Sequence, residues 1–324
     1  MERKKPPDVC VFHLVWAPFG LGTFEEFVAS YRANPAELPH RLRIIFNGFT
    51  PGFDYTPYRT LLDGLEYDSL TTVQAVQDLP AYFTAAESVD TPFVCFLNSY
   101  CRIQEPGWLE KLYRHARRER VGVVGATGSY ASPWNNLQLY EGLPKNRYLR
   151  AVRLRLERWL PGWFPGLSGE EALWRPHMLD FLGFPNYHIR TNGFLLRRDL
   201  MIRLKRPRFR NKMECYKFEH GRQSMTQQLL KKGLEPLVVG RDGRAYGKEE
   251  WYESRTLHSG DQSNLLISDN MTRLYAGLDR EMRWRYACAV WGEKAEKEEA
   301  QEKETSAEAL AGRPVGWPAG TLDA

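Results

Sequence analysis

The sequence predicts an α/β protein whose core is a doubly wound, mostly parallel sheet flanked by helices. Several short runs are almost continuously apolar, which is typical of strands buried on both faces of a parallel sheet. Stretches with helical spacing of apolar residues separate these runs, and Gly, Pro or Asn marks their ends. A chain of 324 residues, 43% hydrophobic and 26% charged, suits one large globular domain of this class.

The first expected unit is a strand, a helix and a second strand. Residues 9–16 (VCVFHLVW) form the first apolar run, and Thr23 with Glu26 has the spacing of a capping box at the start of a helix. Residues 42–46 (LRIIF) form the second strand, which an Asn-Gly pair closes. Because connections between such strands are short and right-handed, we expect the two strands to pair in parallel.

The alternation continues along the chain. Residues 79–88 indicate a helix, residues 92–97 (PFVCFL) a third strand and residues 121–124 (VGVV) a fourth. Another helix starts near Trp108, and residues 237–239 indicate a further short strand. Ligands of open sheets bind beyond the carboxyl ends of the strands, so polar residues just after a strand are the first candidates for a site.

Residues 148–164 combine an apolar stripe with arginines. The stripe consists of Tyr148, Leu149, Val152, Leu156, Trp159, Leu160 and Trp163. The interleaved arginines are Arg150, Arg153, Arg155 and Arg158. Such a helix can lie on an anionic membrane, or it can pack its stripe into the core and leave the arginines in water. Both alternatives remain open at this point.

Charge is unevenly distributed along the chain. The formal net charge is +5, whereas residues 293–324 hold eight acids and four bases, a net of −4. This tail is Glu/Lys/Ala-rich and then Gly/Pro-rich, and we expect it to be disordered or a fraying helix. The remaining, more basic part suits an anionic partner such as a nucleotide diphosphate or an acidic lipid. No compact Lys/Arg run is present, so we expect no nucleic acid partner.

The cysteines and the N-terminus bear on the compartment. Five cysteines without CxxC spacing argue for a reducing environment and against a disulfide framework or a zinc site. The charged start MERKKPPD and the short apolar run after it do not fit a signal peptide, and no run is long enough to span a membrane. The sequence predicts a cytoplasmic protein, acting at the inner face of the plasma membrane if residues 148–164 bind lipid.

Four segments follow one another in a distinctive order. They are residues 9–16 with the helix after them, 91–112 (TPFVCFLNSYCRIQEPGWLEKL), 121–130 (VGVVGATGSY) and 188–201 (HIRTNGFLLRRDLM). This order resembles the GT-A fold glycosyltransferases, most nearly the family-2-like bacterial enzymes, in a subgroup with FLNSY in place of the Asp-x-Asp motif. The resemblance covers roughly residues 8–240.

The resemblance implies both a fold and a reaction. The fold is GT-A-like, with residues 1–132 as the nucleotide-sugar-binding half and residues 133–292 as the acceptor and catalytic half of the same domain. The reaction is transfer of a sugar from a nucleotide-sugar donor to a hydroxyl of a polysaccharide or lipid-linked glycan, with inversion at the sugar carbon. Peripheral contact with an anionic membrane would bring the enzyme to a lipid-linked acceptor.

The sequence departs from the family at the metal-binding motif. In the family, the Asp-x-Asp carboxylates hold a divalent cation against the donor diphosphate. Here Asn98, Ser99 and Tyr100 stand in their place, and these side chains can hydrogen-bond the donor but would hold Mg²⁺ or Mn²⁺ poorly. We therefore expect Arg222 and Arg241 to neutralise the diphosphate, with a divalent cation as the alternative.

A second departure concerns the catalytic base, the carboxylate that removes the acceptor's proton. The family supplies it from an acidic pair at the start of a helix that ends in Gly, here Gly233. Counting back from this glycine reaches Gly221 and Arg222, and Glu219 two residues earlier is our candidate. The alternative is a carboxylate that only interacts with the positive N-terminal end of a helix.

Three further residues are candidates for contact with the donor. They are His13 in the first strand, Asp54 after the second and Asp78 before the third. A lone His in an apolar run is often a core residue, and Asp54 has the character of a turn residue. Asp78, which precedes Leu-Pro, also fits the pattern of a helix N-cap.

A polar cluster precedes the strand expected at residues 193–196. Arg190, Thr191 and Asn192 are expected on the acceptor side, together with Asp242 in the glycine-flanked loop after residues 237–239. A buried polar network is the alternative for the cluster, and a surface ion pair with Arg241 is the alternative for Asp242.

Other functional classes fit less well. A nucleotidyltransferase usually opens with a basic, Gly-rich phosphate loop, and residues 17–22 (APFGLG) contain no Lys or Arg. A dinucleotide-binding dehydrogenase needs Gly-x-Gly-x-x-Gly, but Glu25 occupies the third glycine position after Gly20 and Gly22. A non-catalytic module that binds glycan or nucleotide is the main alternative, because the expected acids are missing.

Overall fold

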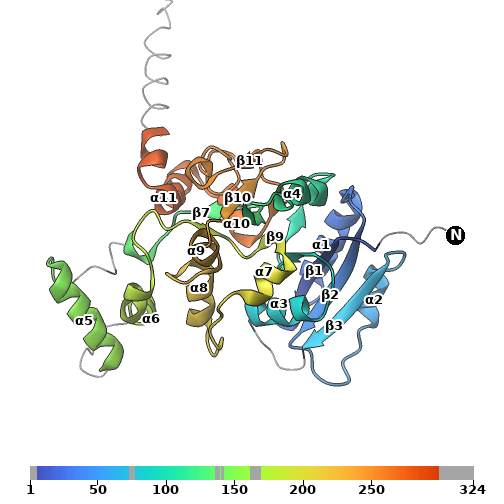
Figure 1. Ribbon diagram of the computed structural model, residues 1–324, viewed down its shortest axis with the longest axis horizontal. Coiled ribbons are helices and arrows are strands. Elements are labelled where there is room, and N and C mark those ends of the chain that lie inside the picture. Colours follow the sequence, from blue (N-terminus) through green and yellow to red (C-terminus); the bar gives the residue numbers. More distant parts are fainter. Residues whose placement is uncertain (1–5, 73–76, 136–138, 140–141, 161–168, 299–324) are drawn as a thin grey trace, which may run out of the picture.

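The central feature of the computed structural model is a mixed, mostly parallel sheet of eight strands, in the order β3-β2-β1-β4-β9-β6-β10-β11 (Figure 1). The structure describes residues 6–72, 77–135, 139, 142–160 and 169–298. Strand β9 runs antiparallel to both neighbours, and β11 is antiparallel to β10; the other pairs are parallel. The strands are β1 (Val9–Trp16), β2 (His40–Asn47), β3 (Tyr67–Thr72), β4 (Phe93–Leu97), β6 (Val121–Gly125), β9 (Gly193–Arg197), β10 (Glu235–Val239) and β11 (Ala245–Tyr246).

Helices cover both faces of this sheet, which confirms the predicted fold class. One apolar layer contains α1 (Gly22–Ala33), α2 (Thr56–Leu61) and α4 (Trp108–Ala116). The other layer contains α3 (Asp78–Glu87), α7 (Arg198–Arg203), α8 (Lys212–His220), α9 (Met225–Leu230) and α11 (Arg280–Trp291). Two short pairs complete the described strands, β5 (Arg102–Ile103) with β12 (Ile267–Ser268) and β7 (Gly128–Ser129) with β8 (His188–Ile189).

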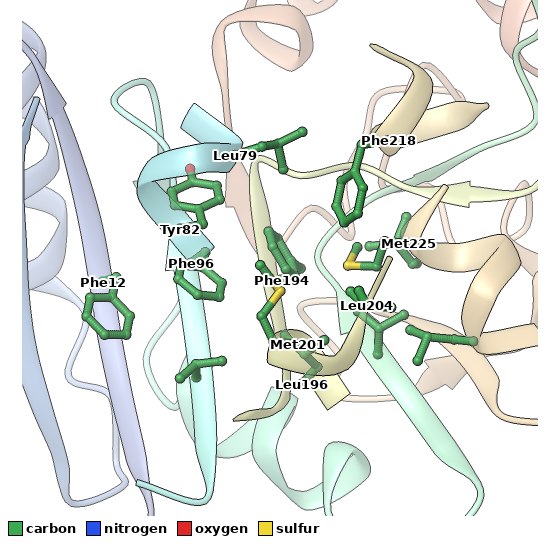
Figure 2. Packing of buried hydrophobic residues seen from close by; sticks show 14 of the residues in the cluster. Phe12, Leu79, Tyr82, Phe96, Phe194, Leu196, Met201, Leu204, Phe218 and Met225 are labelled. Atoms are coloured by element: carbon green, nitrogen blue, oxygen red, sulfur yellow. The ribbon is translucent and has the colours of Figure 1, made fainter. Parts of the chain in front are cut away.

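Stacked aromatic rings hold the central strands to α3 (Figure 2). Phe12, Phe96 and Phe194 are cross-strand partners on β1, β4 and β9, with ring centroids 5.3 Å and 5.2 Å apart. Tyr82 of α3 stacks on Phe96 at 4.6 Å. Each such side chain, when fully buried, stabilises the fold by about 1.5–3 kcal/mol. The continuous apolar runs of the sequence therefore correspond to strands covered on both faces.

The side chain of His13 points to the other face of the sheet, which α1 covers, and it is not exposed to solvent. Its ring is fully buried and stacks on Phe27 at 3.5 Å, with Phe24 at 5.7 Å. Burial lowers the pKa of His13 to about 3, so the side chain is neutral at physiological pH. The expectation that His13 contacts the donor is therefore corrected: side chains alternate along β1, and this position faces α1.

The helix α5 (Arg147–Trp159) turns its apolar stripe outward. Leu154 and Glu157 are its buried residues, and Glu157 accepts hydrogen bonds from Arg153 and from the buried Arg175, at 2.8 Å and 2.7 Å. The stripe faces solvent, with Trp159 at 78% exposure. Figure 1 shows α5 beside α6 (Gly169–Trp174) at the edge of the molecule, remote from β1–β3. Packing of the stripe into the core is thus excluded for the described residues, and Trp163 lies outside them.

One smaller expectation is also corrected. Helix α1 begins at Gly22 after Leu21, and no side chain caps it, so the expected capping box does not form. Residues 293–298, the start of the tail expected to be disordered or a fraying helix, are helical, and Ala295 is buried. The rest of that tail lies outside the described residues. No helix in the described part of the chain has the length and apolarity needed to cross a bilayer.

We predict that His13→Phe makes the protein less sensitive to acid. Below pH 6.5 the unfolded chain protonates this histidine, whereas the folded state resists protonation down to a pKa of about 3. The unfolded state therefore binds more protons, and His13 costs about 1.4 kcal/mol of stability per pH unit as the pH falls through this window. Urea unfolding at several pH values measures the free energy of unfolding of variant and wild type. The difference between them should widen as the pH falls, and an unchanged difference at every pH would contradict the prediction.

Candidate functional site

A cleft of about 650 Å³ opens where β1 and β4 end and β9 begins. These three ends meet because β9 is antiparallel, so that its first residue, Gly193, pairs with the last residue of β4, Leu97. Eight of the residues proposed from the sequence line the cleft: Asp78, Asn98, Ser99, Tyr100, Arg190, Thr191, Asn192 and Glu219. The cleft is therefore the candidate site.

The turn after β4 is held by its own side chains. Asn98 Oδ1 accepts hydrogen bonds from the Tyr100 N–H at 3.1 Å and from the Cys101 thiol at 3.3 Å. Ser99 Oγ donates to Leu14 O at 2.8 Å and accepts from Trp16 N–H at 3.2 Å, which ties the turn to the end of β1.

The residues at the Asp-x-Asp position therefore do not fit a divalent cation. A hard cation needs several oxygen ligands, preferably carboxylates. The two candidate oxygens, on Asn98 and Ser99, already take part in hydrogen bonds within the protein. Within the described residues, no group of three or more His, Cys, Asp or Glu side chains is arranged to hold a metal ion.

The loop of residues 190–192 connects the two sides of the cleft. Its Thr191 N–H donates to Glu219 Oε1 at 3.0 Å, and its Asn192 carbonyl accepts from the Asn98 N–H at 2.9 Å. One short segment thereby positions the end of α8 and the turn after β4 relative to each other.

A buried carboxylate anchors this loop. Asp269 Oδ2 accepts hydrogen bonds from Arg190 Nη1 at 2.6 Å and from the Asn192 amide, while its Oδ1 accepts from Thr272 N–H and caps α10 (Asn270–Ala276). Burial opposes ionisation of Asp269, but the guanidinium and these hydrogen bonds keep its pKa below the ordinary value. The charge is compensated, as a buried ion pair requires.

Two carboxylates and a lysine share the centre of the cleft. Glu219 lies in the last turn of α8, and Asp78 is the first residue of α3. Burial raises the pKa of Asp78, and the nearby negative charge of Glu219 raises it further, although Lys212 opposes both effects. The N-cap of α3 is Gln77, so the capping interpretation of Asp78 is wrong.

Glu219 also lacks the structural role that was its alternative. It lies at the C-terminal end of α8, where the helix dipole disfavours a negative charge, and α9 starts only at Met225 with Ser224 as its cap. The hydrogen bond from Thr191 N–H holds the carboxylate at this unfavourable place. A carboxylate held beside the cleft at the negative end of a helix suits a chemical role.

Aromatic and imidazole rings form the far end of the cleft. Trp174 stacks on Tyr216 with ring centroids 5.0 Å apart, and the ring centroids of His220 and His188 are 5.2 Å apart. Burial, together with the neighbouring His220, lowers the pKa of His188 to about 3, and burial lowers that of His220 to about 4. Both rings are neutral near pH 7. They offer hydrogen bonds and ring faces there, but no positive charge.

Both arginines expected at the diphosphate lie outside the cleft. Arg222 is exposed and donates from Nε to Leu179 O at 2.9 Å. Arg241 lies 3.7 Å from Glu105, in a separate hollow of about 220 Å³. The expectation is corrected because the loops that carry these arginines fold away from the ends of β1 and β4. The cleft's own cations are Arg190 and Lys212.

Two acids expected in the site also lie elsewhere. Asp54 is exposed, and hydrogen bonds from the side chain and from the backbone N–H of Thr56, the latter at 2.9 Å, lower its pKa. Asp242 is exposed, and it accepts from Arg244 N–H and from the Tyr246 hydroxyl. Neither lines the cleft. Asx turns of this kind look like ligand-side acids in sequence.

Several residues of the site were not found by sequence reasoning. The most informative are Lys212, Trp174, Tyr216 and Asp269. Lys212 and Tyr216 share α8 with Glu219, at helical spacing, so the helix that carries the candidate base was the available signal. No sign in the sequence linked Asp269 to the site, because its two partners there, Arg190 and Asn192, precede it by 79 and 77 residues.

No protein-family model matches the sequence, and no curated protein matches it either. Among solved structures, the chain is similar to a mannosyltransferase from Pyrobaculum calidifontis, with 11% identity, a TM-score of 0.44, and coverage of 96% of this chain and 82% of that one. It is also similar to glucosyl-3-phosphoglycerate synthase from Mycobacterium tuberculosis, with 14% identity, a TM-score of 0.32, and coverage of 60% and 58%. Such distant likeness assigns no role to any residue of this chain.

We predict that Asp269→Asn destabilises the protein by about 3 kcal/mol, because it leaves the Arg190 guanidinium without its buried countercharge. Asparagine is itself a good N-cap, so the loss reports mainly on the ion pair. The matched control is Asp279→Asn, at the exposed cap of α11, where we expect a change below about 0.5 kcal/mol. Urea unfolding measures both, and equal losses in the two variants would contradict the proposed anchor.

Proposed function

We propose that this protein is a glycosyltransferase that moves a sugar from a nucleotide-sugar donor to an acceptor hydroxyl. The observation that carries the proposal is the bridge through residues 190–192, which sets the carboxylate of Glu219 across one cleft from the turn at Asn98. Ligands of open α/β sheets bind at this edge, beyond the strand ends. The sequence resemblance to GT-A glycosyltransferases implies a donor at Asn98–Tyr100 and a base near Gly221 and Arg222, and Glu219, two residues earlier, is the candidate for that base.

In this proposal the donor lies over the ends of β1 and β4. Trp16, Phe19 and Tyr100 supply apolar and aromatic surface for the nucleotide, and the Asn98 amide supplies a hydrogen-bond donor. Lys212 supplies positive charge for the leaving diphosphate in place of a carboxylate-held cation, and Arg190, whose charge Asp269 compensates, contributes only hydrogen bonds from its remaining N–H groups.

Glu219 acts as the general base. Its Oε1 is held by Thr191 N–H, and the carboxylate accepts the proton of the acceptor hydroxyl as that oxygen attacks the anomeric carbon. The bond from this carbon to the diphosphate oxygen breaks, and the diphosphate leaves with the electron pair. Attack opposite to the leaving group inverts the configuration, which agrees with a single carboxylate acting as base.

We predict that Glu219→Gln lowers the turnover number by a factor of about 10²–10⁴ and leaves donor binding unchanged, because the amide keeps the shape but cannot take a proton. The matched control is Glu214→Gln, on the same helix but outside the cleft. Transfer from a panel of nucleotide sugars to glycan acceptors, with nucleotide release as readout, measures both variants.

Two arms of this assay separate the alternatives. Transfer that persists in excess chelator supports the cation-free reaction, and transfer that requires Mn²⁺ overturns it. A protein that binds a nucleotide sugar but neither transfers nor hydrolyses it is a binding module of the same fold. The observation that favours this second candidate is that the oxygens of Asn98 and Ser99 are already engaged in hydrogen bonds within the protein and are therefore poor metal ligands.

We further propose that α5 rests on an anionic membrane. At 100° per residue, its exposed apolar side chains span about 100° of the helix circumference, flanked by Arg155 on one side and Arg153 on the other. The acid of the helix, Glu157, is buried, so the outward face presents arginines and apolar groups together. This is the arrangement of a helix that lies in a membrane interface.

We predict that Trp159→Ser weakens binding to vesicles containing phosphatidylserine by about tenfold, because a Trp side chain leaves the interface. Trp284→Ser removes a partly exposed tryptophan of α11 and serves as the matched control, with binding unchanged. Vesicle cosedimentation at low and high salt measures both, and we expect salt to weaken the wild type. If Trp159→Ser and Trp284→Ser bind vesicles equally well, the proposal that α5 lies in the membrane interface is contradicted.

A further inference from the structure

A small apolar hollow of about 160 Å³ opens beside the far end of the cleft. It is lined by Ala131, Ser132, Pro133, Leu139, Trp174 and His220. Ala131, Trp174 and His220 line the main cleft as well, so the hollow is a side branch of the cleft.

Two polar groups around the hollow are already used inside the protein. Ser132 Oγ donates to Leu182 O at 2.5 Å, and the neighbouring Trp134 Nε1 donates to Phe181 O at 3.3 Å. The neutral imidazole of His220 also lines the hollow, but one ring cannot match the several hydroxyls of a buried sugar, which disfavours binding of a sugar here. The hollow therefore suits hydrocarbon.

The wall of the hollow is continuous with the buried apolar cluster that holds α5 against the rest of the protein. Leu139 packs in one buried cluster with Leu154 of α5 and with Met178, and Trp174 contacts the same cluster. The opposite face of α5 carries the exposed apolar stripe. Through these shared residues, the cleft, the hollow and the buried face of α5 follow one another, and Figure 1 shows α5 beside α6, the helix that ends in Trp174.

From these observations we infer that the hollow binds the apolar aglycone of an amphiphilic glycoside, whose sugar ring lies in the main cleft near Trp174 and His220. This inference rests on the proposed function and specifies its acceptor: a glycolipid-type molecule presented from the membrane, not a free polysaccharide. The ring of Trp174, which lines both cavities, lies at the junction between sugar and hydrocarbon, as suits an aromatic side chain with an apolar body.

The inference is tested by calorimetric binding of octyl glucoside, kept below its micelle concentration, and of methyl glucoside. Each methylene buried strengthens binding by about fourfold, so the octyl compound should bind at least tenfold more tightly. Leu139→Trp, which fills the hollow, should remove this advantage. Ala131→Leu fills it from the cleft side and should do the same, which provides a second variant if Leu139→Trp does not fold.

Leu156→Ser on the exposed face of α5 is the matched control, because it lies outside the hollow and should leave octyl glucoside binding unchanged. Equal affinity for both glucosides, or wild-type affinity in the two filled variants, overturns the inference. So does loss of binding in Leu156→Ser, which would put the alkyl chain on the helix surface.

The test is independent of turnover. If the protein binds octyl glucoside through the hollow but transfers no sugar, the subsite is supported and the proposed enzymatic function is contradicted. If it transfers sugar to methyl and octyl acceptors with the same KM, the enzymatic function is supported and the subsite is contradicted.

Discussion

The ion pair between Asp269 and Arg190 is the interaction on which the geometry of the cleft depends. It fixes the loop of residues 190–192 against α10, and that loop in turn holds Glu219 and the turn at Asn98. Charge compensation at one buried point therefore sets the distance between the two sides of the site. Because the carboxylate also caps α10, the C-terminal part of the chain is connected to the same point.

The direction of β9 explains why a loop before a strand contributes to the site at all. In a purely parallel sheet, segments that precede strands lie at the edge opposite the ligands. Strand β9 is antiparallel to β4 and β6, so its first residue, Gly193, lies beside the end of β4. The polar cluster of residues 190–192 thus joins the polar turn that follows β4.

Sequence reasoning predicted the sheet well and the site in part, for physical reasons. Continuous apolar runs identify strands covered on both faces, and residues just after β4 had to lie at the ligand edge. Arg222 and Asp54 could not be placed, because loop paths depend on packing that leaves no local pattern. His13 was misassigned because alternation along a buried strand is invisible when both faces are apolar. The sequence of α5 left two alternatives open, because its apolar stripe is the same whether the stripe is buried or exposed.

Ser99 constrains how this site could be redesigned. Its hydroxyl joins the ends of β4 and β1, because it donates a hydrogen bond to the Leu14 carbonyl and accepts one from the Trp16 N–H. A carboxylate could not replace it, since a carboxylate only accepts hydrogen bonds. Installing an acid at this position to create a metal site would therefore loosen the seam between β1 and β4 that the metal would need. A cation-dependent version of this cleft would require rebuilding that seam first.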